Sequence, residues 1–539
     1  MVFTSEEKAI LNVFFTNTDK DIFAVRPWMP EQEIAILFAR YSRNPKDLRR
    51  TFLDELYVKS DVLQKVCDVV TTHPELLQVD HPKTRSFFKK FLQDFGHNSV
   101  AELGTGHIAV EGVSNIVTKI LERRLVSPLE KSTRYVWFDQ NSLFMEPTIM
   151  KSSHATRYQT AVSGLMSTYQ TLIDPMIAFL HAKHKDDPAI ARQLAAGKKP
   201  KILFRPQACD VLRYLLPGAT QTNVGITGHA RALDTLIVNM LSQPLQESRD
   251  VARDMHDELK LVLPYLIAYS SAHFDQGIDN GYFAQTPELL NDLAKEIIGV
   301  AEDIPQVDPV ELVYHDPDGE DKVIAAMLYD LRDMHLPKSE LLRRVKAMSE
   351  TDKDRLVDTF FQHRVQPNLF NPDSEFAHQP LRALEDAIVD FDVLMDYGAY
   401  RDLQRHRAGT YRVQRLTTLH GYDVPEQIID AGFEQIYREV IEQAADAHNI
   451  IHADLPEEAQ YVVPFAFKVR YNMRMNLRSA FYMVELRTKP GGHISYRKIA
   501  KDMADHITQV YPRIGKQFHM ILDGLDEGSI SRVDAKSKE

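Results

Sequence analysis

The feature that most constrains this chain is an internal repeat, which predicts two modules of one fold. The stretch "AELGTGHIAVEGVSNIVTKILERR" ends at Arg124, and "ALEDAIVDFDVLMDYGAYRDLQRHR" ends at Arg407. Each stretch carries a glutamate 22 residues before its final arginine, Glu102 in the first and Glu385 in the second. We therefore interpret the two stretches as copies of one segment.

A second pair of similar stretches follows in the same order. "LRYLLPGATQTNVGITGHARAL" and "QYVVPFAFKVRYNMRMNLRSA" each place a proline 14 residues before an arginine, at Pro217 and at Pro464. Two matches in one order predict tandem modules, the first at residues 20–275 and the second at 295–530. The connection falls near "FDQGIDNGYFAQTPELL", whose Gly, Asn, Asp and Pro residues predict a series of turns.

Bulk composition narrows the class of protein and its partners. A chain of 539 residues is long enough for two domains. No apolar run reaches the roughly 18 residues that a membrane span needs, and the N-terminus has no basic region before its apolar part. The net charge of -12 disfavours long nucleic acid as a partner, although a local arginine cluster still binds small anions. Two cysteines, Cys67 and Cys209, exclude a disulfide framework, and we expect a cytoplasmic protein.

Apolar periodicity predicts a mostly helical chain with a few strands. Val113, Ile116 and Val117 share one face of a predicted helix with Ile120 and Leu121, and Val393, Tyr397 and Tyr400 do the same in the second copy. Each arginine cluster therefore lies near a helix C-terminus, where cations are favoured. "STRYVWF", residues 132–138, is rich in aromatic and β-branched residues and predicts a strand. "GTGHIA" stops short of GxGxxG, so a Rossmann nucleotide site is not supported.

Taken together, these motifs resemble the flavin-dependent thymidylate synthase family. Its members carry RHRxxSxNExSxRY, a GHxSxxE-type segment upstream and an NxRSL…LR segment downstream. They are homotetramers that bind FAD and transfer a methylene group from methylenetetrahydrofolate to dUMP, with NADPH as reductant. The resemblance implies an α+β fold of two tandem modules, in each of which long helices pack on a small, mostly antiparallel sheet.

The first module matches the upstream and tail motifs. The GHxSxxE segment supplies His97, Ser99 and Glu102, and the tail supplies Glu130, Ser132, Arg134 and Tyr135. Arg213 matches an arginine that the family uses on the nucleotide phosphate, Ser42 matches a flavin-side serine, and Arg231 matches the arginine of NxRSL. The other family positions are changed, with Glu122 and Arg123 at the start of RHR, Leu129 at its asparagine, and His229 and Met240 downstream.

The second module keeps what the first has lost. RHR is intact as Arg405, His406 and Arg407, and the downstream segment keeps Asn476, Arg478, Ser479 and Arg487. Its tail is changed, with Val413, Arg415 and Thr417 at the glutamate, serine and arginine positions, and Gln460 replaces the phosphate arginine.

These complementary losses predict one complete composite site between modules. In the family, one subunit gives RHR and the final arginine, and its neighbour gives ExSxRY and the arginine before the proline. Here Glu130, Ser132, Arg134 and Arg213 would combine with Arg405, Arg407 and Arg487. The converse pairing would be silent. We expect a homodimer whose four modules imitate the family tetramer.

The resemblance also implies roles for individual residues. Arginine forks suit a nucleotide phosphate because they form paired hydrogen bonds and stay charged. The expected nucleotide-binding residues are Glu130, Ser132, Arg134, Arg213 and Arg487. The expected catalytic residues are Ser132, Arg487 and His97, with His97 on the folate side of the flavin. The expected FAD-binding residues are Arg405, His406, Arg407, Asn476, Arg478, Ser99 and Glu102.

Two departures keep other functions open. Asp402 replaces a family glutamine three residues before RHR, and Leu129 removes a polar contact near the flavin. The same scaffold could therefore act on another nucleotide or use another one-carbon donor. A third hypothesis is a non-catalytic protein that binds nucleotide or flavin.

Each motif also has a structural interpretation. An arginine pair at a helix end is usually a solvated cap. His448 and His452 lie one helical turn apart, as metal ligands do, but without HExxH we interpret them as structural and expect no metal.

Overall fold

The computed structural model describes residues 3–88, 90, 98–122, 125–134, 136–277, 281–299, 304–305, 307–364, 379–489, 492–520 and 522. The chain forms two compact units. Unit 1 comprises Met1–Gln170, Leu216–Asp303 and Glu442–Val463. Unit 2 comprises Thr171–Leu215, Ile304–Ile441 and Pro464–Glu539.

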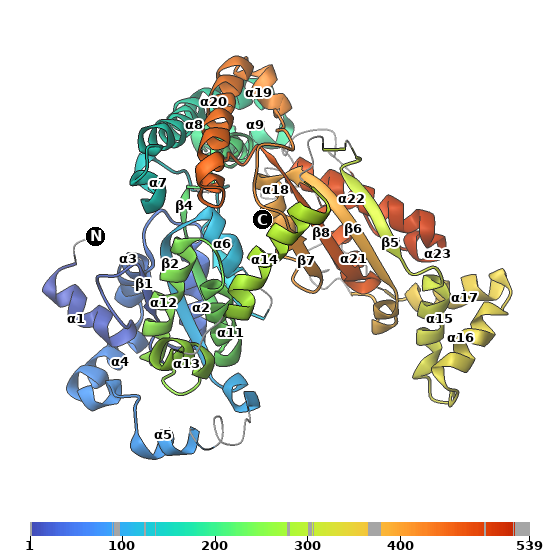
Figure 1. The fold of residues 1–539 in the computed structure, drawn as a ribbon, viewed down its shortest axis with the longest axis horizontal. Helices are drawn as coiled ribbons and strands as arrows, with labels where there is room; N and C mark the ends of the chain where they lie inside the picture. Colours follow the sequence, from blue (N-terminus) through green and yellow to red (C-terminus); the bar gives the residue numbers. More distant parts are fainter. Residues whose placement is uncertain are drawn as a thin grey trace. The chain divides into compact units, whose positions relative to one another are not determined.

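Unit 1 is built from one sheet and its covering helices (Figure 1). Its strands are β1 (Ile22–Ala24), β2 (Thr105–Ser114), β3 (Ser127–Glu130) and β4 (Gln221–His229). Its helices are α1 (Ser5–Phe14), α2 (Glu31–Tyr41), α3 (Leu48–Thr51), α4 (Asp61–Thr72), α5 (Pro82–Phe88), α6 (Asn115–Leu121), α7 (Pro147–Met150), α11 (Ala230–Leu241), α12 (Gln246–Lys260), α13 (Ala268–Gln276) and α14 (Gly281–Ile297). Short 3-10 or π turns are η1 (Phe52–Leu56), η2 (Tyr57–Lys59), η3 (Pro74–Leu77), η5 (Asn98–Glu102), η6 (Gln140–Ser142) and η10 (Glu458–Val462).

Unit 2 has the same kind of construction. Its strands are β5 (Val310–His315), β6 (Ile388–Asp396), β7 (Thr410–Val413) and β8 (Lys468–Asn476). Its helices are α9 (Pro188–Ala195), α10 (Pro200–Leu212), α15 (Gly319–Tyr329), α16 (Lys338–Lys346), α17 (Glu350–Phe361), α18 (Tyr397–Leu403), α19 (Glu426–Asp430), α21 (Leu477–Arg487), α22 (Ile494–Val510) and α23 (Pro512–Gly515), with the turns η7 (Arg213–Leu215) and η9 (Arg382–Asp386). Two long helices, α8 (Ala155–His184) and α20 (Glu434–Asp454), contribute residues to both units.

The two sheets share one topology. Unit 1 has the strand order β1-β2-β4-β3 and unit 2 has β5-β6-β8-β7, and every neighbouring pair is antiparallel. In chain order, a short helix follows the second strand of each sheet, α6 in unit 1 and α18 in unit 2. A longer helix follows the fourth strand, α11 in unit 1 and α21 in unit 2. The predicted α+β class with antiparallel sheets is confirmed.

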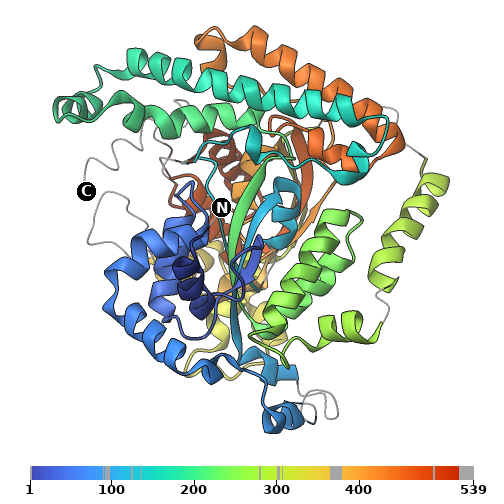
Figure 2. The same ribbon diagram turned by 90° about the vertical axis from the view of Figure 1, so that its left-hand side faces the viewer.

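The sheet of unit 1 is buried on both faces. Ile108 and Val110 of β2 pack in one apolar cluster with α6, α11 and α12, whereas Ala109 between them packs in a second cluster with α1 to α4. This alternation follows from the two-residue period of a strand. Figure 2 shows the two groups of helices on opposite sides of the strands. Phe38 of α2 lies so close over Gly225 of β4 that a Cβ there would meet its ring at 2.9 Å.

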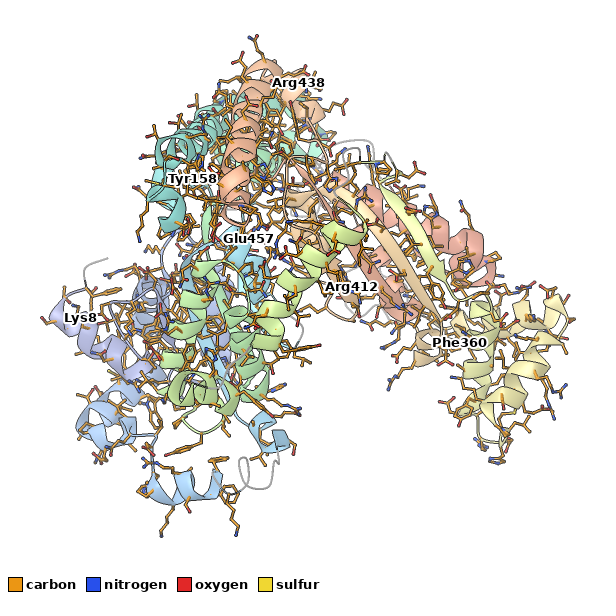
Figure 3. The ribbon with its side chains drawn as sticks, in the orientation of Figure 1. Lys8, Tyr158, Phe360, Arg412, Arg438 and Glu457 are labelled. Atoms are coloured by element: carbon orange, nitrogen blue, oxygen red, sulfur yellow. The ribbon has the colours of Figure 1, made fainter. Side chains whose placement is uncertain are left out.

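Unit 2 covers one face of its sheet and leaves the other more open. Helix α22 packs on β5 and β6, and alternate residues of β8 are buried. The pair Ala109–Gly225 of unit 1 corresponds in register to Asp392–Asn472 of unit 2. On this polar face Arg470 donates to Asp392 at 2.9 Å, and Arg412 lies exposed on β7 (Figure 3). Because an acid and an amide take the places of Ala and Gly, this face offers no apolar surface for a helix such as α2.

Helices α6 and α18 begin later than apolar periodicity predicts. Val113 and Val393, which the sequence places on helical faces, belong to strands β2 and β6. The helices start after Ser114 and Asp396, whose side chains accept from the backbone N–H of the third following residue. Such caps satisfy N–H groups that the first helical turn leaves open.

The predicted strand at residues 132–138 is wrong for its described residues. The strand β3 ends at Glu130, and Ser132 begins a turn in which the N–H of Val136 donates to the Ser132 carbonyl at 3.1 Å. Val136 and Phe138 are buried individually. Their apolar character therefore reflects burial rather than strand pairing.

The connection between the predicted modules is partly helical. Gly277 adopts a left-handed conformation, φ 66°, and ends α13, as expected of a turn-rich segment. Gly281–Ile297 then form α14 despite Pro287 inside it. Good helix formers such as Leu, Ala, Glu and Lys dominate after the proline. The predicted module bounds, 20–275 and 295–530, remain predictions.

Candidate functional site

An arginine-rich turn follows helix α18 in unit 2. The helix ends at Leu403, and after Gln404 the RHR motif follows as residues 405–407. Arg405 is exposed, and His406 and Arg407 are half-buried. Helix α18 starts at the Asp396 cap, and all seven of its residues are buried. A short, fully packed helix thus fixes where the turn begins, and the predicted position of this cluster at a helix C-terminus is confirmed.

Arg213 lies in the same unit, beside this turn. Its Nη1 is 3.4 Å from Oδ2 of Asp402 and 3.9 Å from Oδ1 of Asp210. The other Asp402 oxygen, Oδ1, is 3.5 Å from Nη1 of Arg405. The Arg213 side chain is only 2% exposed. Asp402 therefore joins Arg213 of the first sequence module to Arg405 of the second within unit 2.

Arg487 joins the cluster through His406. Its Nε donates a hydrogen bond to His406 Nε2 at 2.7 Å. Burial and then the Arg487 charge lower the pKa of His406 to about 3. The ring is therefore neutral at physiological pH, and its Nε2 serves as an acceptor. The Arg487 guanidinium also lies 5.3 Å from the ring centre of Tyr496, a cation–π distance.

Glu130 of unit 1 belongs to a buried ionic cluster. Lys119 Nζ lies 3.0 Å from the Glu130 carboxylate and 2.6 Å from that of Glu122. The sequence comparison did not single out Lys119, although a basic residue one helical turn before Glu122 is a pattern that could have shown it. Within unit 1, Glu130 is thus held by a lysine.

Ser132 lies beside a pocket of unit 1. Its N–H donates to the Ser42 carbonyl at 2.9 Å, and its Oγ accepts from the N–H of Arg134 at 3.3 Å. The pocket has a volume of about 650 Å³ and is lined by Ile36, Ala39, Arg40, Ser42, Arg43, Asn44, Pro45, Glu55 and Leu129. The structure thus brings together Ser42 and Leu129, which the sequence analysis placed near the flavin, and Ser132, which it placed at the nucleotide.

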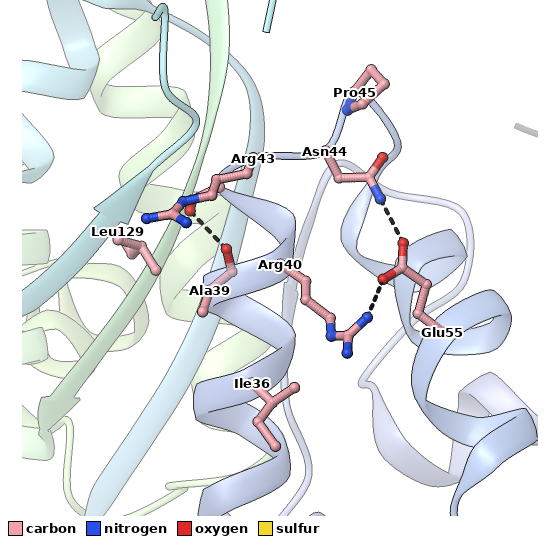
Figure 4. Close-up of a pocket in the computed structure, with 9 residues that line it drawn as sticks. Ile36, Ala39, Arg40, Arg43, Asn44, Pro45, Glu55 and Leu129 are labelled. Carbon is pink, nitrogen blue, oxygen red and sulfur yellow. Dashed lines mark hydrogen bonds and ion pairs between the residues drawn. The ribbon is translucent and has the colours of Figure 1, made fainter. Parts of the chain in front are cut away.

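Figure 4 shows how the polar groups of this pocket are arranged. Arg40 and Asn44 both donate to Glu55, at 2.6 and 2.8 Å. Arg43 lies on the side of Leu129. The sequence reading missed Arg40 and Arg43, although they flank Ser42 in "ARYSR". Two arginines line this pocket, and an anionic ligand there would compete with Glu55 for Arg40.

The other predicted cofactor residues make matching contacts in both units. Glu102 pairs with Arg231 at 2.7 Å in unit 1, and Glu385 pairs with Arg478 at 3.2 Å in unit 2. Asn476 caps α21 by accepting from the N–H of Ser479 at 2.9 Å, and His229 caps α11 in the same way. These contacts give the residues structural roles whether or not they bind FAD.

The remaining predicted residues fall into two groups. Ser99 is exposed on η5 of unit 1, and Arg134 is half-buried in the turn after β3. His97, Arg123, Arg124 and Tyr135 lie outside the described residues.

The structure aligns helices α6 and α18 one residue differently from the sequence comparison. Ser114 and Asp396 take equivalent places in their strand pairs, opposite Gln221 and Lys468. Glu122 and Gln404 are the C-caps of the two helices. The sequence comparison had aligned Glu122 with Arg405. The difference arises from a bulge in β2 between Val110 and Val113, where Gly112 has φ 64°.

The sequence pattern of one family covers most of the chain. The family described as thymidylate synthase complementing protein matches residues 40–265 and 311–513. The chain belongs to this family. The first match contains strands β2, β3 and β4, and the second contains β6, β7, β8 and most of β5. The predicted resemblance is therefore confirmed in both halves of this thymidylate synthase complementing protein family member.

Relatives of two kinds are similar to this family member. The UPF0159 protein of Chlamydia pneumoniae is 34% identical over 95% of this chain and 93% of its own length. The UPF0159 protein of Thermoplasma acidophilum is 28% identical over 80% of this chain and 88% of its own length. The flavin-dependent thymidylate synthase of Clostridium tetani is 29% identical over 34% of this chain and 69% of its own length.

In the part of the chain that the structure describes, no helix has both the length and the apolar character that a membrane crossing requires.

Proposed function

We propose that this protein is an FAD-dependent methyltransferase that converts dUMP to dTMP, with methylenetetrahydrofolate as one-carbon donor and NADPH as reductant. The observation that carries the proposal is the cluster of Arg213, Arg405 and Arg487 in unit 2, linked by Asp402 and His406. Arg213 comes from the first half of the sequence and the others from the second. The complementary loss of motifs in the two modules predicts that a complete site combines arginines from both halves of the sequence.

In this proposal the arginines bind the nucleotide and hold its phosphate. A nucleotide monophosphate carries about two negative charges, and converging arginine forks bind it with paired hydrogen bonds. His406 orients Arg487 by accepting its Nε–H. Ser132 and Arg134 of the first module are further proposed nucleotide-binding residues, whereas the Glu130 carboxylate is buried against Lys119. Arg407 binds FAD, and two chains form a homodimer of four modules.

The residues present fit FAD. The pocket beside Ser42 has a volume of about 650 Å³, within the range of small-molecule sites. Arg40 and Arg43 line it and suit the phosphates of a dinucleotide once Arg40 exchanges Glu55 for a phosphate. FAD, when bound, supplies hydride transfer to the pyrimidine, a chemistry that needs no protein thiol. Cys67 and Cys209 are both buried. The chain's own residues hold the ligands and stabilise negative charge on them.

A second candidate is the same scaffold acting on another pyrimidine nucleotide or with another one-carbon donor. Asp402 lies between two of the proposed phosphate-binding arginines, and an apolar residue, Leu129, lines the proposed flavin pocket. Comparing turnover of dUMP with that of other pyrimidine nucleotides separates the two candidates.

The visible absorption spectrum of the purified protein tests the proposal first. We expect a flavin spectrum that shifts on addition of dUMP, followed by turnover with methylenetetrahydrofolate and NADPH. Arg405→Ala should weaken the dUMP-induced shift. Arg412→Ala, which removes an exposed arginine of the same unit from strand β7, is the matched control and should leave it unchanged.

A colourless protein that takes up no added FAD would overturn the proposal and favour a non-catalytic family member. A flavin spectrum that does not change with dUMP but shifts with another pyrimidine nucleotide would favour the second candidate.

A further inference from the structure

The proposed phosphate site contains a carboxylate in contact with two of its arginines. Asp402 Oδ2 lies 3.4 Å from Arg213 and Oδ1 lies 3.5 Å from Arg405, so its two oxygens face two different guanidinium groups. Each arginine presents its Nη1 to the carboxylate, so a phosphate bound between the same arginines would compete with Asp402 for these groups. The carboxylate and the phosphate are thus alternative partners for one pair of cations.

We propose that Asp402 is a specificity-determining residue that competes with the ligand phosphate for Arg213 and Arg405, so that the site discriminates against ligands by their negative charge. This inference rests on the proposed function, because that function brings a phosphate to these arginines. A nucleotide monophosphate binds in full only when Asp402 gives up both contacts.

The local packing keeps Asp402 where it competes. It lies on the fully packed helix α18, and its side chain is 11% exposed, so it cannot simply turn into solvent. The Arg213 side chain is 2% exposed, and its Nη1 also lies 3.9 Å from Oδ1 of Asp210. Both partners of the ion pair are therefore held in a weakly hydrated region, where charge–charge interactions are stronger than at a surface. A phosphate dianion placed there meets the Asp402 charge at close range.

Replacing only the charge tests the proposal. Asp402→Asn keeps the shape of the side chain and removes its negative charge. Asp392→Asn is the matched control, because it removes one carboxylate of the same unit from its pair with Arg470 on the open sheet face. Binding of dUMP, deoxyuridine and inorganic phosphate to the full-length protein is measured by calorimetry, with no need for turnover.

We expect Asp402→Asn to lower the Kd of dUMP by about ten-fold or more, because a like charge is removed from within about 4–6 Å of the phosphate. Inorganic phosphate should also bind more tightly, whereas the Kd of uncharged deoxyuridine should stay the same. Asp392→Asn should change none of these constants.

Four results would overturn the inference. Equal tightening of dUMP and deoxyuridine would show that Asp402 acts through shape. Weaker dUMP binding in Asp402→Asn would show that the carboxylate positions the arginines for phosphate. A wild-type protein that binds and turns over dUMP, with an Asp402→Asn variant that binds it no better, would remove Asp402 from specificity and leave the proposed function intact. If neither protein bound dUMP or phosphate, the inference and the proposed nucleotide site would both fail.

Discussion

A buried carboxyl group and a serine meet at the same place in both units, with their positions exchanged. In unit 1 the Glu247 carboxylate accepts from Ser114 Oγ at 2.6 Å and from the Ser114 N–H at 2.7 Å. In unit 2 the acid is Asp396, the residue equivalent to Ser114, and it accepts from Ser495 Oγ. Tyr461 also donates to Glu247 at 2.7 Å. Burial raises the pKa of Glu247 to about 7 and that of Asp396 to about 6.

The raised pKa of Glu247 predicts that unit 1 loses stability as the pH rises. The folded protein binds this proton more tightly than the unfolded chain, whose carboxyl has its ordinary value near 4.5. Stability therefore falls between about pH 4.5 and pH 7, by on the order of 3 kcal/mol for a shift of this size. Glu247→Gln should flatten this dependence in thermal unfolding measured from pH 5 to pH 8.

The exposed Glu288 on α14 offers a control, since Glu288→Gln should leave the slope as in the wild type. An unchanged slope in Glu247→Gln would show that another group titrates.

His406 predicts a second effect at the residue scale. Because its ring is neutral and accepts from Arg487 Nε, His406→Ala removes the acceptor that orients this arginine. Hydrogen bonds to charged groups contribute about 1.5–3 kcal/mol, so the Kd of dUMP should rise about ten-fold or more. His406→Gln retains an acceptor and should lose less. Equal losses in both variants, measured by calorimetry, would assign the effect to ring packing instead.

At the scale of elements, spacing in the sequence predicts the repeat but not its local register. Glu102 and Arg124 lie as far apart as Glu385 and Arg407. The structure reaches this equal count by adding a residue in the β2 bulge and omitting one after α6, where Leu125 has a φ of 78°. Two compensating changes leave no trace in a residue count. They become visible only in strand pairing.

Burial also explains which sequence expectations failed. "STRYVWF" has the composition of a strand, yet Val136 and Phe138 belong to an irregular segment and bury their side chains there. A high strand propensity indicates that a residue favours packing against an apolar surface. Tertiary packing then decides whether that residue lies in a strand or in an irregular segment. The caps Ser114 and Asp396 likewise set the helix starts more sharply than apolar periodicity does.

The contact between α2 and the sheet carries a prediction at this scale. A Cβ at Gly225 would meet the Phe38 ring at 2.9 Å, so Gly225→Ala must displace α2, which lines the pocket beside Ser42. Overpacking of this kind costs about 1–3 kcal/mol. We expect a lower unfolding midpoint and weaker uptake of added FAD. Adding Phe38→Leu should recover part of both losses, and a Gly225→Ala protein with wild-type stability would contradict the packing argument.

At the scale of the whole molecule, the compact units combine segments from distant parts of the sequence. Thr171–Leu215, which carries Arg213, belongs to unit 2, and Glu442–Val463, which carries Gln460, belongs to unit 1. The motifs of the sequence identified Arg213 and Arg405 as members of one site. They could not show that Asp402 lies in contact with both, because its contact with Arg213 spans 189 positions of the chain.

The exchanged segments provide a matched pair of variants that tests the asymmetry of the molecule. Arg213 and Gln460 each lie four residues before the equivalent prolines, and both are buried, yet only Arg213 brings a guanidinium group to its unit. If the protein has one complete type of nucleotide site, Arg213→Gln should raise the Kd of dUMP about ten-fold or more through loss of a charged hydrogen-bond donor. Gln460→Ala should leave it nearly unchanged, with circular dichroism confirming that both variants are folded. Equal losses in the two variants would show that both units bind nucleotide, and complementary loss of motifs would no longer explain why each half of the sequence keeps a different set of residues.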